Sequence, residues 1–220
     1  MISVQIHVAD LDERIATAMR LIDATHPDLG SGVSREARGL AVLLLFASYE
    51  NLLTGLTRTL LEGAVRCGVS NRRLRPGFRM FAIDSAVQSL RNVSEKKVFV
   101  SALPDLIRAA GASDRPGSIN TNGFPNDGSY FRRSQIVVWC RTFGVPNPEV
   151  SLSKIWPQID SVVNDRNGIA HGRLTPEAVG RNYTELEIRS LISDWRDAWT
   201  GFLARVEGLA ATRDFFRITR

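Results

Sequence analysis

Residues 166–171, with the sequence Arg-Asn-Gly-Ile-Ala-His, place an arginine, an asparagine and one of the three histidines of the chain within six positions. A histidine with an ordinary pKa of about 6.5 accepts and donates protons around neutral pH. The guanidinium of Arg166 can stabilise negative charge that develops on a phosphorus centre. The Asn167 amide can orient a phosphate or the imidazole of His171, because it both donates and accepts hydrogen bonds. These side chains therefore have the chemistry to hold a phosphodiester and to move a proton.

The local pattern predicts a helix, which would fix the geometry of this motif. Asn167 and His171 are four residues apart and share one helical face. Arg166 lies about 140° around an ideal helix from His171 and has to reach in with its long side chain. Gly168 costs about 1 kcal/mol of helix stability relative to alanine, and it would allow another backbone or a ligand to approach closely.

A structural alternative exists for the motif. His171 would then be a histidine at a helix C-terminus, favoured there by the helix dipole, and Arg166 would only pair with Asp165 or Asp160.

The six residues resemble the Arg-Asn-x-x-x-His signature of HEPN domains, with the RiboL-PSP type as the nearest match. Residues 47–53, Ala-Ser-Tyr-Glu-Asn-Leu-Leu, resemble the acidic and aliphatic stretch in the first core helix of these domains. The order of long helices, polar loop, motif helix and last helix agrees as well. The resemblance covers roughly residues 34–212.

This resemblance implies an all-α antiparallel helical bundle and a metal-independent endoribonuclease, with neither a metal ion nor a cofactor. Such enzymes cleave RNA by attack of the 2′-hydroxyl and often act as toxins or anti-phage effectors. The implied catalytic residues are Arg166, Asn167 and His171, with Glu50 facing the motif helix and ordering Arg166 or His171. Glu50 could instead be a simple surface glutamate, and other members of the family have lost catalysis and only bind RNA or a protein.

The assembly of the family bears on the chemistry. Two proton transfers ask for more than one His171, and in the family two protomers pair so that both motifs line one cleft. A homodimer is therefore expected, besides RNA and an antitoxin or defence-system protein as partners.

The net charge of +5 and the pI of about 9.8 come almost entirely from arginine, since only three of the 28 basic residues are lysines. The arginine fork suits phosphate, although a GC-rich genome would produce the same bias. The densest arginine cluster is predicted to bind the RNA backbone, unless it is only a solvated turn; it consists of Arg72, Arg73, Arg75 and Arg79. A second candidate patch for RNA binding follows the longest loop and consists of Arg132 and Arg133.

Other classes of protein are disfavoured by composition. No run of eighteen apolar residues occurs, so a membrane span is not expected, and no signal-peptide pattern is visible. Cys67 and Cys140 have no metal-ligand spacing, which disfavours a zinc site and fits a reducing cytoplasm.

Periodicity and capping signals predict the helices. An added N-terminal helix and linker (residues 1–33) precede the helical domain (34–212), and a basic tail (213–220) follows. The expected helices cover 10–25, 34–67 with Ser34 as cap and Gly68 as stop, 81–110 with a break near Pro104, and 129–143. Ser153 would cap the motif helix, Thr175 a short helix, and a Thr184–Glu187 capping box the last one, which runs to about Thr212. The four tryptophans are expected in the core, and residues 111–128 form the longest loop.

Overall fold

A computed structural model describes residues 2–26, 30–113, 118–124 and 131–219 of the chain. Across these ranges the protein is helical and forms no sheet; an isolated bridge pairs Leu74 with Arg217. The predicted all-α class is thus confirmed.

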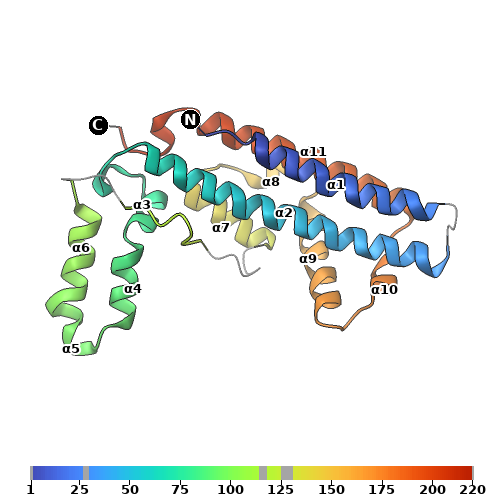
Figure 1. Cartoon of the computed structure of the whole chain (residues 1–220), viewed down its shortest axis with the longest axis horizontal. Helices are drawn as coiled ribbons and strands as arrows, with labels where there is room; N and C mark the ends of the chain where they lie inside the picture. Colours follow the sequence, from blue (N-terminus) through green and yellow to red (C-terminus); the bar gives the residue numbers. More distant parts are fainter. Residues whose placement is uncertain (1, 27–29, 114–117, 125–130, 220) are drawn as a thin grey trace.

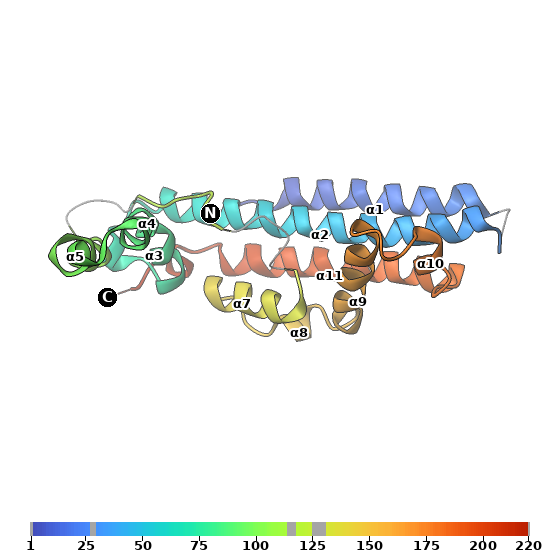
Figure 2. The ribbon, with the colours of Figure 1, turned by 90° about the horizontal axis from the view of Figure 1, so that it is seen from below.

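Three long helices form the body of the bundle: α1 (Gln5–Thr25), α2 (Gly32–Arg66) and α11 (Glu185–Leu209). They run side by side along the long axis of the molecule (Figures 1 and 2). Helix α2 is buried along most of its length, with large side chains such as Leu45, Leu52 and Leu60 in the core. By length and composition α2 could cross a membrane, yet 56% of its most apolar window is buried inside the protein, as in the core helix of a bundle.

The ends of α2 show how local signals set its bounds. The Ser31 hydroxyl accepts the Ser34 backbone N–H at 3.1 Å, so Ser31 is the cap and the prediction of Ser34 was wrong. Both serines have cap chemistry, and Gly32 and Val33 extend the helix by most of a turn. The predicted stop is confirmed, because Gly68 adopts φ +60° directly after Cys67, a conformation that glycine tolerates best.

Four shorter helices lie beside the body: α7 (Arg133–Phe143), α8 (Pro148–Ser151), α9 (Trp156–Ala170) and α10 (Pro176–Gly180). Helix α9 begins after Ile155 without a side-chain cap, so the prediction of Ser153 was wrong. Pro157 lies in its first turn, where proline is tolerated. The capping roles of Thr175 and of the Thr184–Glu187 box are confirmed. Residue 129, the predicted start of α7, falls outside the described residues, but Phe131 and Arg132 are not helical, so the helix begins later than predicted, at Arg133.

Helix α10 packs against α2 with backbone in contact with backbone. A Cβ atom on Gly39 would lie 1.9 Å from the Pro176 carbonyl oxygen, and one on Gly180 would lie 1.8 Å from the Arg35 carbonyl oxygen. The buried Arg38 guanidinium donates to the Gly180 carbonyl at 3.1 Å. This contact fixes the segment that follows α9.

At the other end of the body, a helical arm projects from the bundle (Figures 1 and 2). After α3 (Pro76–Ala82), it consists of α4 (Asp84–Asn92), α5 (Glu95–Lys97), a π-helical turn (Val98–Ala102) and α6 (Leu103–Gly111). One helix over 81–110 with a break near Pro104 was therefore wrong. The breaks fall at Ile83 and at Val93–Ser94, while Pro104 lies in the first turn of α6, where proline is tolerated.

The last residues belong to the core. Helix α11 ends at Leu209, short of the predicted Thr212, and Phe215 and Phe216 are buried against Phe78. The apolar face of α1 joins the same core. Trp139, Trp195 and Trp199 are fully buried, as predicted, and Trp156 is partly buried against the core.

Candidate active site

Helix α9 carries a polar stripe along one side. Asp160, Asn164, Asn167 and His171 follow each other at intervals of four, three and four residues, which places them within about 60° on an ideal helix. Asn164 is exposed and Asp160 and Asn167 are half-buried. Outside the stripe, α9 buries Ile159, Val162 and Val163 in the core. The stripe is therefore the side of α9 that a ligand can reach.

Arg166 starts on the buried side of α9 and bends toward the stripe. Its guanidinium carbon lies 4.5 Å from the centre of the Phe46 ring on α2, a cation–π contact. Its Nη1 atom donates to the Asn167 side-chain oxygen at 3.0 Å. The aromatic ring covers the apolar part of the side chain while the charged end stays at the stripe.

Arg166 forms no ion pair within the part of the chain that the structure describes. The two carboxylates that the structural alternative offered it have other partners. Asp160 pairs with Arg133 at 2.8 Å, and Asp165 accepts a hydrogen bond from the Tyr183 hydroxyl at 3.2 Å. The positive charge of Arg166 is thus available to an anionic ligand.

The start of α7 meets the same stripe. Arg132 donates to the Asn164 side-chain oxygen at 2.8 Å. The Arg133 backbone N–H donates to Asp160 at 3.0 Å and its guanidinium to the same carboxylate at 2.8 Å. Asp160 therefore caps the positive end of α7, and one arginine contacts each of three stripe residues. Only Arg133 among the three is neutralised by a carboxylate in the described ranges.

An aromatic cluster holds these arginines in place. Phe46, Tyr49 and Phe131 pack edge to face with ring centres 5.3–5.7 Å apart. The Tyr49 hydroxyl donates to the Phe131 carbonyl at 2.8 Å, directly before Arg132. The cluster therefore ties the start of α7 and the Arg166 side chain to one segment of α2.

The pKa values report the same proximity of charges. Burial, followed by the charges of Glu50 and Asp160, raises the pKa of Tyr49 well above its ordinary value, against the charges of Arg166 and Arg132. For Asp160, burial is outweighed by the hydrogen bonds from Arg133 and by the charges of Arg133 and Arg132, so its pKa is lowered. Tyr49 therefore stays a neutral donor, and Asp160 stays charged at neutral pH.

His171 lies at the C-terminal end of α9, as the cap residue. Gly172 follows at φ +68°, and the Arg173 N–H donates to the Gly168 carbonyl at 2.8 Å, as in a Schellman motif. A Cβ atom on Gly168 would lie 2.7 Å from a Leu174 methyl group, so the close approach expected at Gly168 is made by the chain itself. The imidazole is exposed and forms no hydrogen bond or ion pair with any described residue.

Glu50 is half-buried on α2, one turn after Phe46. It was expected to order Arg166 or His171, yet it forms no hydrogen bond or ion pair with either of them among the described residues. Arg166 instead rests on Phe46, a residue that was not among those expected in the site. The periodicity of α2 alone gives no sign that an aromatic ring would serve as the platform.

The two predicted basic patches lie in different places. Arg132 and Arg133 belong to the α9 site, whereas Arg72, Arg73, Arg75 and Arg79 lie between α2 and the arm, at the far end of the bundle (Figure 1). Arg79 donates to the carbonyls of Arg72 and Leu74 and thus stabilises that turn.

Comparison with protein-family models, with curated proteins and with solved structures found no match. Within the ranges described here, no three His, Cys, Asp or Glu side chains come together as a group that could hold a metal ion.

Proposed function

We propose that this protein is a metal-independent endoribonuclease of the HEPN type. One observation carries the proposal: Arg166 and Arg132, both without a carboxylate partner in the described structure, are held beside a stripe of α9 that ends at His171. Guanidinium groups bind phosphate through paired N–H donors. The amides of Asn164 and Asn167 offer further N–H donors at the same place.

The chemistry follows from the residue types. An imidazole of His171 removes the proton from the ribose 2′-hydroxyl, and the 2′-oxygen attacks the adjacent phosphorus. Arg166 stabilises the negative charge that builds on the phosphoryl oxygens. The 5′-oxygen leaves and takes a proton from a second imidazole. The products carry a 2′,3′-cyclic phosphate and a 5′-hydroxyl group.

The second imidazole comes from a second copy of the chain in this proposal. His171 is exposed at a helix end, so the motifs of two protomers can meet about a two-fold axis, the commonest symmetry of oligomers. The doubled charge of such a dimer would attract RNA to the shared cleft. We place the enzyme in the cytoplasm, as a toxin or anti-phage effector held in check by a protein partner.

A non-catalytic module that binds RNA or a protein is the second candidate. It is favoured by the free imidazole, because no described group fixes the tautomer of His171 or brings it to Arg166. Binding through Arg132 and Arg166 needs neither.

The deciding experiment digests RNA in the presence of a chelator and compares the wild type with His171→Ala. His26→Ala is the matched control, because His26 is an exposed histidine that pairs with Glu185 at 2.6 Å, away from the stripe. We expect cleavage by the wild type and the control and none by His171→Ala. Equal cleavage by all three would refute the mechanism, and no cleavage by any of them would favour the binding module.

A further inference from the structure

A second arginine-lined cavity lies at the far end of the bundle. It has a volume of about 310 Å³ and is lined by Ser70, Arg72, Arg73, Ser113 and Ile218. Two arginines and two serines therefore border this space, and none of its described lining residues carries a carboxylate. This combination of donors suits an oxyanion and disfavours a cation.

The donors of this cavity are unused in the described structure. Neither Arg72 nor Arg73 forms an ion pair there, and the buried Nε atom of Arg73 has no hydrogen-bond partner among the described residues. Leaving a buried donor unsatisfied costs roughly 1–3 kcal/mol, and more when the group is charged. An anion in the cavity would offset this cost through its attraction to the charged guanidinium.

The backbone around the two arginines is held from three sides. The Arg72 N–H donates to the Ala112 carbonyl at 3.0 Å, and the Arg73 carbonyl accepts the Ile218 N–H at 2.8 Å. The Asn71 side chain donates to the Ala109 carbonyl at 2.8 Å. The backbone that carries the two arginines is therefore fixed before a ligand arrives, which lowers the entropic cost of binding.

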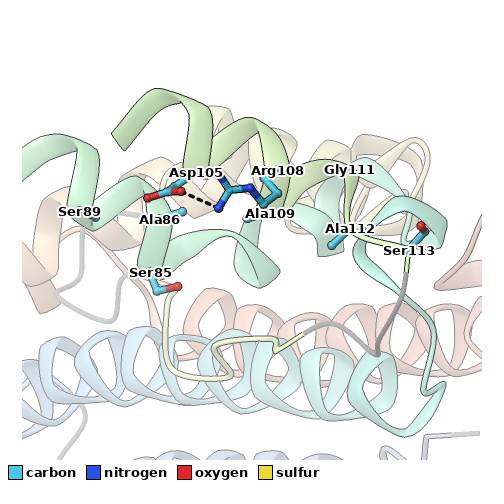
Figure 3. A pocket seen from close by; sticks show the side chains of 9 residues that line it. All are labelled: Ser85, Ala86, Ser89, Asp105, Arg108, Ala109, Gly111, Ala112 and Ser113. Carbon is cyan, nitrogen blue, oxygen red and sulfur yellow. Dashed lines mark ion pairs between the residues drawn. The ribbon is translucent and has the colours of Figure 1, made fainter. Parts of the chain in front are cut away.

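A larger cavity of about 730 Å³ lies between α4 and α6, and Ser113 lines both spaces. Figure 3 shows it bordered by small side chains and hydroxyl groups, with Arg108 turned to Asp105, to which it is paired at 2.9 Å. The charge of Arg108 is thus already neutralised. The larger cavity has room for an uncharged group attached to a phosphate in the smaller one.

The two arginine sites are far apart. Phe46, under Arg166, and Arg66, at the end of α2, are separated by twenty residues of one helix, which is about 30 Å at 1.5 Å per residue. The cavity begins four residues beyond Arg66. A single nucleotide cannot occupy both sites.

We propose that the cavity at Arg72 and Arg73 binds a phosphate of the RNA strand, with the attached nucleoside in the space between α4 and α6. This inference rests on the proposed function and deepens it. The substrate is then an RNA long enough to reach from the α9 stripe to the far end of the bundle, and a short oligonucleotide uses the α9 site alone.

The first test measures binding of a long 2′-O-methyl RNA, which cannot be cleaved because it has no free 2′-hydroxyl. Arg72→Gln is compared with Arg20→Gln. Both remove one exposed arginine that forms no ion pair in the described structure, but only Arg72 lines the cavity, and Arg20 lies on α1 outside every predicted basic patch. We expect Arg72→Gln to weaken binding roughly threefold to tenfold and to lower the salt-dependence slope by about 0.7, as for one lost phosphate contact with a single strand. Arg20→Gln should change affinity less than twofold. Equal effects of the two variants would overturn the proposal, since they would show a general charge effect.

Two further arms separate the alternatives. A dinucleotide substrate should be cleaved equally by the wild type and Arg72→Gln. If neither protein cleaves any RNA, the proposed nuclease function is refuted, whereas the measured effect of Arg72→Gln on RNA binding remains valid. Inorganic phosphate should compete with the long RNA in the wild type. If phosphate binds in a way that needs Arg72 while the affinity for RNA does not change, the cavity serves a free phosphate, and the assignment to RNA is refuted. Arg73→Gln tests the second guanidinium of the cavity in the same RNA-binding measurement. Its unfolding transition is first shown to be unchanged, so that a loss of affinity does not reflect a loss of folding.

Discussion

Replacing Asp160 tests whether the α9 site depends on the fixed positions of its arginines or only on the amount of positive charge gathered there. The Asp160 carboxylate accepts both the backbone N–H and the guanidinium of Arg133, at 3.0 and 2.8 Å. It is the single carboxylate in the described structure that joins the start of α7 to α9 by an ion pair. Asp160→Asn keeps an acceptor for the N–H and loses the charge, whereas Asp160→Ala loses both.

The magnitudes follow from these two contacts. Loss of a capping acceptor at a helix start costs about 1 kcal/mol. The ion pair with Arg133 is partly exposed, at 29% for the Asp160 side chain and 40% for that of Arg133, so it contributes only about 0.5 kcal/mol. We therefore expect the free energy of unfolding to fall by about 1.5 kcal/mol in Asp160→Ala and about 0.5 kcal/mol in Asp160→Asn.

The dependence on pH gives an independent check. The pKa of Asp160 is lowered in the folded protein, so its carboxylate stabilises the fold above the unfolded-state pKa of about 3.9. This stability is lost as the pH falls through the lower, folded pKa. The difference between the wild type and Asp160→Asn should therefore be full at neutral pH and shrink under acid conditions.

Urea unfolding, followed by the fluorescence of the buried Trp139 and Trp195, measures these differences. RNA cleavage supplies the functional result. Removing Asp160 raises the net charge from +5 to +6, so a mere concentration of charge predicts unchanged or faster cleavage. Positioning predicts slower cleavage by Asp160→Ala, because Arg132 and Arg166 lose their fixed relation. Unchanged or faster cleavage by Asp160→Ala, or equal destabilisation of the two variants at every pH, would refute the reasoning.

Three further expectations concern the platform, the α2–α10 contact and the assembly. Phe46→Leu should cost about 2 kcal/mol of stability through lost ring and cation–π contacts and should lower kcat/KM for RNA under conditions where the variant is folded; unchanged kcat/KM would argue against the platform. Gly39→Ala should destabilise the protein by about 1–3 kcal/mol in urea unfolding, because its Cβ would meet the Pro176 carbonyl, whereas Gly201→Ala, with open space around it, should stabilise it by up to about 1 kcal/mol; similar behaviour of the two would contradict the close contact. Light scattering should give twice the chain mass of 24.4 kDa, and a monomer that still cleaves RNA would remove the shared cleft.

The long helices could be predicted from the sequence because their signals are local. The Thr184–Glu187 box, Thr175 and Gly68 act within one turn of the helix ends that they define. Ser34 failed as a cap because Ser31, three residues earlier, has the same chemistry, and only the packed structure decides between them. The breaks at Ile83 and Val93–Ser94 carry no proline, which explains why the sequence placed the break at Pro104 instead.

The site could be predicted only as far as one segment reaches. Arg166, Asn167 and His171 lie within six residues, so their spacing alone indicated a shared element. The Arg132–Asn164 hydrogen bond and the Phe46 platform join residues that are 32 and 120 positions apart in the chain. Such pairs depend on how α2, α7 and α9 cross, which no local pattern encodes. The sequence therefore indicated Arg132 and Arg133 as a basic patch but not their place beside the motif.

The arrangement of charge suggests why this site should bind an anion. Three arginines meet along one stripe, and the described residues provide one ion-paired carboxylate, Asp160, for them. The like charges of Arg132 and Arg166 raise the energy of the free protein, and burial on Phe46 limits how far Arg166 can move away. A phosphate between them would relieve this repulsion and would add charge-assisted hydrogen bonds. An anion that binds only the folded protein, and not the unfolded chain, stabilises the fold by mass action. The repulsion that lowers the stability of the free protein is therefore offset when the anion binds.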